Sequence, residues 1–116
     1  MRNYENYALG KWKKGDGEGT PLYNAITAKE IGRASSKGLD FSEMMSYARK
    51  VGSPTLRKMT FQERGLMLKA LALHLHSIKN KFYALSGETG ATKIDSWIDI
   101  EGGIGNIFAN ASLRKN

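Results

Sequence analysis

The sequence predicts a mainly α-helical fold with an N-terminal β-hairpin, which together make an α+β arrangement. The stretch from Thr60 to Ser112 holds almost all of the long helical periodicity. The first residues instead form short aromatic and aliphatic runs that glycine-rich stretches interrupt. We therefore predict a β-hairpin and loop segment over residues 1–38 and a helical segment over residues 39–116. A chain of 116 residues fits one small domain.

Most of the net charge of +7 lies in the front half of the chain. Residues 1–60 hold eleven basic and six acidic side chains. Such an excess can attract nucleic acid, acidic lipid or a phosphorylated ligand. The charges are scattered apart from Lys11, Lys13 and Lys14, and a solvated surface is the simplest interpretation of that run. No nucleic-acid motif accompanies the charge, so we expect no nucleic-acid partner.

The chain contains no cysteine, which excludes disulfides, thiolate metal sites and a cysteine nucleophile within these 116 residues. The first residues lack the apolar core of a secretory signal. The richest apolar segment, residues 66–78, is interrupted by Lys69, His74 and His76. We expect a cytoplasmic protein with no membrane partner.

The N-terminal segment is predicted to contain one β-hairpin, preceded by a strand or a second, tight hairpin. Residues 7–12 form an aromatic run with a Gly-Lys pair inside it, which indicates a strand or a tight hairpin, and the glycine-rich residues 15–19 indicate a loop. Residues 22–26 and 30–34 flank a turn at 27–29 and predict a β-hairpin. The glycine run lacks the spacing of a phosphate-binding loop, so we do not assign it that role.

Capping pairs mark the first two predicted helices. Asp40 with Glu43 predicts a helix over about 41–51 that ends at Gly52, and the proline of Ser53-Pro54 predicts a break. Thr60 with Glu63 predicts a second helix from Phe61 to about His76.

This second helix and its continuation carry two apolar stripes. The first consists of Phe61, Leu68, Leu71, Leu75, Ile78, Phe82 and Leu85. The second consists of Leu66, Ala70 and Leu73. A helix that is apolar on two sides must be covered on two sides, and the remaining chain is short for that task. We therefore expect an incomplete unit that self-associates, as a dimer or a larger oligomer.

The last two predicted helices follow a kink or short break at 77–80. One carries Phe82, Tyr83 and Leu85 and ends within 87–92, and the other runs from about Asp95 to Leu113. The last helix contains three glycines, which are unfavourable inside helices. Gly102, Gly105, Ala109 and Ser112 fall on one small face, and the larger face, expected to be core, holds Trp97, Ile100, Ile104, Phe108 and Ala111.

No catalytic, cofactor-binding or metal-binding residue is assigned from these patterns. His74 and His76 lie two positions apart and point to different sides of a helix, unlike a metal-binding pair. Asp95 and Asp99 lie near a helix start, where favourable interaction with the helix dipole explains them.

Several segments resemble the aldehyde dehydrogenase family, and within it the dehydrogenase part of the bifunctional phenylacetate-degradation proteins. They are Gly17-Glu-Gly-Thr-Pro-Leu22, Ser36-Lys-Gly-Leu-Asp-Phe41, Leu56-Arg-Lys-Met-Thr-Phe-Gln-Glu-Arg64, Lys69-Ala-Leu-Ala-Leu-His74, Tyr83-Ala-Leu-Ser-Gly-Glu-Thr-Gly-Ala-Thr-Lys93 and Asp95-Ser-Trp-Ile-Asp-Ile-Glu-Gly-Gly-Ile-Gly105. The Glu-Thr-Gly ending is general to the family, whereas the last segment is specific to this subgroup. The resemblance covers nearly the whole chain. The turn Thr27-Ala28-Lys29 departs from the Thr-Gly-Glu usual in the family.

The resemblance implies the N-terminal part of an α/β cofactor-binding domain. The parent enzyme would oxidise a semialdehyde attached to coenzyme A with NADP or NAD as cofactor. The nucleophilic cysteine, the general base, the oxyanion-hole asparagine and the cofactor-binding strands would all lie beyond this segment. We therefore expect this chain to bind no cofactor and to be inactive alone, with the rest of the dehydrogenase subunit as its partner. The alternative is a stand-alone helical oligomerisation or binding module derived from such an enzyme.

The resemblance also implies one tentative site. Aldehyde dehydrogenases use the last helix of this segment as a wall of the substrate channel, often with large side chains. Matching the helix end at Ala111 places Gly102 at such a position, with Gly103 and Asn106 beside it. Small residues there would leave room for a bulky substrate. Alternatively, the glycines only permit close helix packing.

Overall fold

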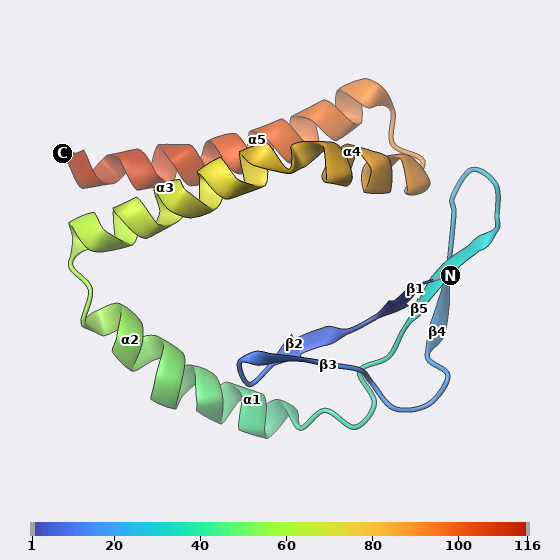
Figure 1. The fold of residues 1–116 in the computed structure, drawn as a ribbon, viewed down its shortest axis with the longest axis horizontal. Coiled ribbons are helices and arrows are strands. Elements are labelled where there is room, and N and C mark those ends of the chain that lie inside the picture. Colours follow the sequence, from blue (N-terminus) through green and yellow to red (C-terminus); the bar gives the residue numbers. More distant parts are fainter. Residues whose placement is uncertain (1, 116) are drawn as a thin grey trace. The chain divides into compact units, whose positions relative to one another are not determined.

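The computed structural model describes residues 2–115, which combine small β-sheets with helices (Figure 1). The strands end at Ala34 and the first helix begins at Phe41. Two compact units divide between Thr55 and Leu56, so the first helix belongs to the same unit as the strands.

The first unit contains the predicted hairpin, and it shows that the aromatic run near residues 7–12 also forms a hairpin rather than a single strand. β2 (Asn6–Ala8) pairs antiparallel with β3 (Lys11–Lys13), and β4 (Thr20–Tyr23) pairs antiparallel with β5 (Glu30–Ala34). The structure adds a strand that was not predicted, β1 (Arg2–Tyr4), which pairs parallel with β5 in the order β1-β5-β4. The buried Gly32 makes this pairing possible, because a Cβ there would lie 2.7 Å from the Arg2 carbonyl oxygen.

The turn between β4 and β5 holds its shape through Asn24. The Asn24 side-chain oxygen accepts hydrogen bonds from the backbone N–H groups of Ile26 and Thr27 at 2.8 and 3.0 Å. Ala28 follows with a φ of 60°. This is the left-handed conformation that favours glycine, so the alanine keeps the backbone geometry that glycine would adopt.

The first helix confirms its predicted start but not its predicted end. Asp40 caps α1 (Phe41–Tyr47) by accepting a hydrogen bond from the Glu43 N–H at 3.0 Å. The predicted break at Ser53-Pro54 is wrong, because the helix continues through a π-helical turn, η1 (Ala48–Gly52), into α2 (Ser53–Arg57). Proline lacks an N–H and crowds the preceding turn of an α-helix, and a wider turn just before Pro54 relieves that crowding.

The second unit contains α3 (Phe61–Ser77), α4 (Lys79–Glu88) and α5 (Lys93–Ser112), followed by the short 3₁₀ turn η2 (Leu113–Lys115). The capping box of Thr60 and Glu63 and the break near residue 78 are confirmed. The last helix begins slightly earlier than predicted. Its N-cap is Thr92, whose side-chain oxygen accepts a hydrogen bond from the Asp95 N–H at 3.1 Å. Asp95 therefore lies in the first turn of the helix.

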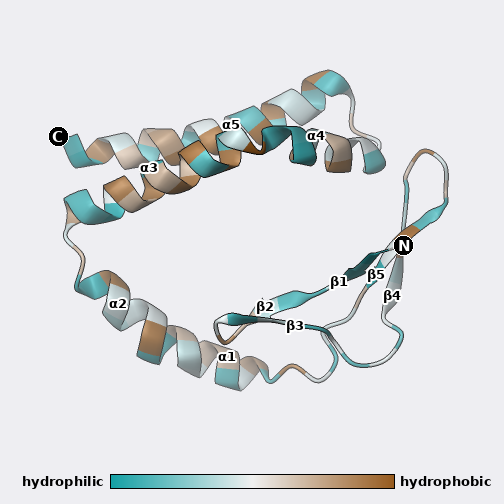
Figure 2. Ribbon diagram, viewed as in Figure 1, coloured by the Kyte–Doolittle hydropathy of each residue, from teal (hydrophilic) through white to brown (hydrophobic). Residues whose placement is uncertain are grey.

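α3 and α5 lie side by side, and small residues form their contact (Figure 1). The buried positions of these two helices are Gly65, Ala72, Ser96, Ile104 and Ala111. Within residues 2–115 no large side chain is fully buried. Hydrophobic residues occur along both helices in Figure 2, and many remain exposed.

The predicted stripes are only partly buried. In the first stripe Leu68, Leu75, Ile78 and Phe82 are half-buried, whereas Phe61, Leu71 and Leu85 are exposed. All of the second stripe is exposed, with Leu66 and Leu73 at 54% and 53%. Trp97, predicted as core, is 59% exposed, while Ile104 and Ala111 from the same predicted face are buried. None of the helices in residues 2–115 combines the length and hydrophobicity needed to cross a bilayer.

Candidate functional site

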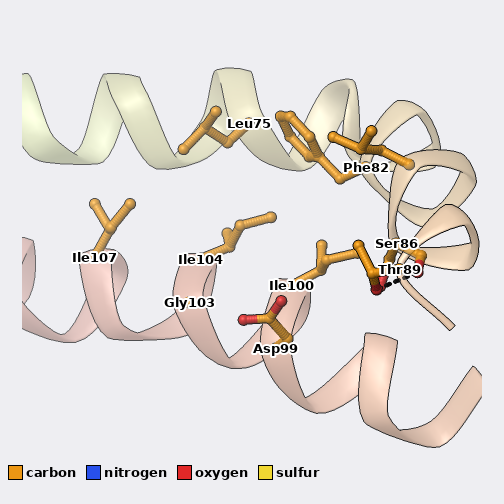
Figure 3. A pocket seen from close by; sticks show the side chains of 10 residues that line it. Leu75, Phe82, Ser86, Thr89, Asp99, Ile100, Gly103, Ile104 and Ile107 are labelled. Atoms are coloured by element: carbon orange, nitrogen blue, oxygen red, sulfur yellow. Dashed lines mark hydrogen bonds between the residues drawn. The ribbon is translucent and has the colours of Figure 1, made fainter. Parts of the chain in front are cut away.

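An apolar groove forms where the second unit's helices separate near the α3–α4 break. Its cavity volume is about 480 Å³. Leu75 of α3 and Phe82 of α4 face Ile100, Ile104 and Ile107 of α5 across this groove (Figure 3). The opening exists because the small residues Gly65, Ala72 and Ala111 bring α3 and α5 close together, while the break at Ile78 starts a new helix.

Two of the three polar side chains that line the groove, Ser86 and Thr89, form hydrogen bonds. Thr89 donates a hydrogen bond from its hydroxyl to the Ser86 carbonyl oxygen at 2.6 Å. The Ser86 hydroxyl lies 2.7 Å from the hydroxyl of the buried Ser96, which joins α4 to α5. Asp99 provides a carboxylate at the rim (Figure 3). No histidine, lysine or arginine is among the residues that line the groove in this part of the chain. The arrangement suits the binding of an apolar group better than acid–base chemistry.

A charged cluster fixes α4 to α5 near the groove. Lys79 Nζ lies 2.9 Å from Glu101 Oε1, and the Tyr83 hydroxyl donates to the same oxygen at 3.3 Å. The hydrogen bond from Lys79 lowers the pKa of Glu101 below its ordinary value, although burial opposes the shift. Burial and the neighbouring Glu101 raise the pKa of Tyr83. Glu101 therefore stays ionised, and Tyr83 stays protonated as the donor.

The three tentative channel residues do not lie together in one cavity. Gly103 lines the groove, whereas Gly102 and Asn106 are not among its lining residues. A Cβ added at Gly102 or Gly103 would meet nothing within 4 Å. Asn106 accepts a hydrogen bond from Asn110 Nδ2 on its side-chain oxygen at 2.8 Å. The small face of α5 is therefore exposed within this chain, so neither Gly102 nor Gly103 serves close packing between the described helices.

The glycine that does serve close packing is one that the sequence patterns did not single out. A Cβ at Gly65 would lie 2.7 Å from Arg114 Cβ and 3.0 Å from the Ala111 carbonyl oxygen. The available signal was the spacing of Gly65, Leu68, Ala72 and Leu75, which alternates steps of three and four and marks the side of α3 that faces α5.

Other residues weighed from the sequence lie outside the groove. His74 and His76 are both exposed on α3. Within residues 2–115, no group of three His, Cys, Asp or Glu side chains could hold a metal ion. The glycine run at 15–19 packs against the chain after β5 instead of opening a helix, since the Asp16 N–H donates to the Lys37 carbonyl oxygen at 2.9 Å.

No protein-family model matches this chain. A comparison with curated proteins finds a 3,4-dehydroadipyl-CoA semialdehyde dehydrogenase from Aromatoleum evansii, which is 32% identical over 111 residues. The matching region covers 95% of this chain and 22% of the relative, so the chain spans about a fifth of the length of the protein it matches. This similarity confirms the resemblance to the aldehyde dehydrogenases of phenylacetate degradation that the sequence segments suggested.

Proposed function

We propose that this chain is the N-terminal part of a nicotinamide-dependent aldehyde dehydrogenase that oxidises a semialdehyde linked to coenzyme A. The observation that carries the proposal is the similarity to the Aromatoleum evansii dehydrogenase, which extends along nearly the whole chain. The groove is consistent with a supporting role, because its described lining is mainly apolar and Ser86 and Thr89 are hydrogen-bonded, with Asp99 as its carboxylate.

In this proposal the remainder of the subunit supplies the chemistry. Aldehyde oxidation by this family begins with attack of a thiolate on the carbonyl carbon, and the 116 residues contain no cysteine. The cofactor, NADP or NAD, would also be held by the remainder of the subunit. The exposed apolar residues of α3 and α5 would then be covered by that partner.

The experiment that tests this proposal determines the reading frame beyond codon 116 and assays both proteins. We expect a continuing frame that encodes a cysteine nucleophile, and a longer protein that reduces NADP or NAD with a CoA-linked semialdehyde. The purified 116-residue chain should show no reduction above the buffer rate. Turnover by the short chain, or a longer protein without dehydrogenase activity, would contradict the proposal.

A second candidate is a stand-alone helical module that oligomerises or binds a partner. It is favoured by the exposure of apolar side chains such as Leu66, Leu73 and Trp97, which a second copy could cover. A native stop codon after residue 116, together with a stable oligomer of the short chain, would support the module over the dehydrogenase segment.

We further propose that Gly102 keeps the substrate channel wide in the longer enzyme, with Gly103 and Asn106 beside it. The open space around Gly102 supports this assignment, because a larger side chain would project outward without meeting the described helices. Gly102→Leu in the longer enzyme should lower kcat/KM for the CoA-linked aldehyde while a small aldehyde is still oxidised. Equal losses on both substrates with a lower Tm would favour a packing role against the remainder of the subunit.

A further inference from the structure

A second groove, entirely within the first unit, separates the β2–β3 hairpin from the start of α1. Its cavity volume is about 520 Å³, which is within the range of small-molecule sites. The hairpin contributes Lys11, Trp12, Lys13 and Lys14, and the opposite side includes Asp40 and Glu43. The groove therefore combines an aromatic ring with basic groups on one side and carboxylates on the other.

The aromatic ring is both exposed and supported. Trp12 is 68% exposed although it lies in a strand. Tyr7 is directly opposite Trp12 in the hairpin register, and their ring centroids lie 5.2 Å apart at an interplanar angle of 73°. This edge-on contact orients the indole and leaves most of it free to stack on a flat ligand.

The basic groups around this ring are uncommitted. Within residues 2–115 no ion pair joins Lys11, Lys13 or Lys14 to a carboxylate, and all three are exposed. All three lysines are among the residues that line the groove. Strand alternation places Lys11 and Lys13 on the other face from Trp12, so their long, flexible side chains would have to reach round the strand to meet a ligand on the ring. A stacking ring with three lysines within two residues of it suits a ligand that joins a flat base to several phosphates.

The hairpin turn that precedes this ring places a leucine in an unfavourable backbone conformation. Leu9 and Gly10 have φ values of 56° and 79°, the conformation of a two-residue hairpin turn that favours asparagine and glycine. Leucine is unusual at such a position. Its side chain lines the groove, where it adds apolar surface next to Trp12. Backbone strain of this kind is found preferentially at binding sites.

We propose that this groove binds the nucleotide end of coenzyme A. The adenine ring would stack on Trp12, its exocyclic amino group would donate to Asp40 or Glu43, and the phosphates would lie among the three lysines. The inference rests on the proposed function, since the CoA-linked substrate comes from the relative's name. It assigns to this chain a role in holding the substrate far from its reacting aldehyde.

The test uses the 116-residue chain and its own fluorescence. The chain has two tryptophans, so Trp97→Phe leaves Trp12 as the sole reporter. Titration of this variant with coenzyme A at an ionic strength of about 0.15 M, where the Debye length is about 8 Å, should quench the Trp12 emission to a plateau. Combined replacement of Lys11, Lys13 and Lys14 by glutamine should raise Kd about tenfold or more, since charge-assisted contacts to phosphate are lost.

A matched control separates a site from general electrostatic attraction. Replacement of the exposed Lys50, Lys58 and Lys69 by glutamine lowers the net charge by the same amount outside the groove. This control should change Kd by less than about threefold, because charges that do not line the groove make no direct contact with the ligand and are screened by salt. An equal loss of coenzyme A affinity in both triple variants would contradict the proposal that the groove is a specific binding site.

The role of the ring is tested by calorimetry on two further variants. Trp12→Phe should weaken binding less than Trp12→Ala, which should raise Kd about fivefold or more because base stacking is lost. Circular dichroism checks that both variants fold. Inorganic pyrophosphate, which has no base, should compete poorly with coenzyme A for the groove. Binding of pyrophosphate as tight as that of coenzyme A would contradict stacking of the adenine ring on Trp12.

Two ligand sources share this chemistry, since NADP also carries an adenosine with several phosphates. Adenosine 3′,5′-bisphosphate and coenzyme A should bind more tightly than adenosine 2′,5′-bisphosphate and NADP. The reverse order would overturn the assignment to coenzyme A. If the longer protein oxidises CoA-linked aldehydes while the groove variants bind coenzyme A normally, the groove proposal alone falls. If the chain binds coenzyme A but the longer protein has no dehydrogenase activity, the proposed coenzyme A site is supported and the proposed function is contradicted.

Discussion

Glycines at different places in the long helices have opposite roles, which single substitutions can separate. Gly65 is buried against Ala111 and Arg114, whereas Gly102 faces open space. Alanine at an open helical position gains about 0.8 to 1 kcal/mol in helix propensity. Overpacking at a close helix contact instead costs about 1 to 3 kcal/mol.

Gly65→Ala should therefore destabilise the chain by about 1 kcal/mol net, while Gly102→Ala should stabilise it by a similar amount. Urea unfolding followed by circular dichroism measures both free energies. A stabilised Gly65→Ala would show that α3 can move away from the Ala111 carbonyl oxygen without loss, which would contradict the close contact.

The turn residue Ala28 carries a cost that glycine would remove. Its φ of 60° is unfavourable for any residue with a Cβ. Ala28→Gly should raise the free energy of unfolding by about 0.5 to 1 kcal/mol, after allowing for the greater freedom of glycine in the unfolded chain. Ala84→Gly in α4 is the matched control and should lower the free energy of unfolding by about 1 kcal/mol. Destabilisation by both changes would contradict the left-handed turn.

Glu101 should make the stability of the second unit depend on acid pH. Its pKa is lowered in the folded state, chiefly by the hydrogen bond from Lys79, so the ionised form favours folding. This contribution is present above the unfolded pKa of about 4.3 and is lost as pH falls through the lower folded value. Glu101→Gln should thus lower Tm at pH 7 and show a smaller further loss between about pH 4.5 and 3 than the parent chain. Parallel Tm curves for the two proteins would exclude the linkage.

At the scale of elements, the caps define where the helices begin. The capping box at Thr60 satisfies two backbone donors at once, through contacts of 3.1 Å in both directions with Glu63. Thr60→Ala should cost about 1 kcal/mol of stability, and Thr60→Ser should cost much less because serine keeps the accepting oxygen. Chemical denaturation compares the two variants, and equal losses would show that the hydroxyl is not the stabilising group.

The local elements were predictable because their signals are local. The β4–β5 hairpin and the helix starts at Phe41 and Phe61 follow from turn residues and caps within a few positions. The pairing of β1 with β5 was missed because a parallel partner is chosen across a long stretch of chain. The continuation past Pro54 was missed because a π-helical turn has no simple sequence signal.

The candidate site was less predictable than the fold, for a related reason. The glycine pattern of α5 was visible in the sequence, but which of its faces lies open depends on the contact with α3. Only Gly103 of the three tentative residues lines the apolar groove. The groove beside Trp12 was not predicted either, because the lysine run and the α1 cap lie far apart in the sequence and meet only in the folded unit.

At the scale of the whole chain, the exposed apolar surface of the second unit is expected to be buried against another protein surface. Leu66 and Leu73 lie on one side of α3 with about half of their surfaces exposed, whereas the buried residues of this helix are Gly65 and Ala72. Contiguous apolar patches of several hundred Å² are uncommon on monomers. In the absence of the remaining subunit, a second copy of the chain is the available partner.

We therefore predict that the 116-residue chain self-associates, most simply as a two-fold dimer, at concentrations of about ten micromolar and above. Sedimentation velocity measures the mass of the particles across a dilution series. Replacing Leu66 and Leu73 together by glutamine should shift the chain to monomers and change stability little, because both side chains are about half exposed. Lys69→Gln on the same helix is the control and should leave the oligomer intact. A parent chain that is monomeric throughout and binds no hydrophobic dye would contradict the prediction. The exposed leucines would then be stable in water without a protein partner.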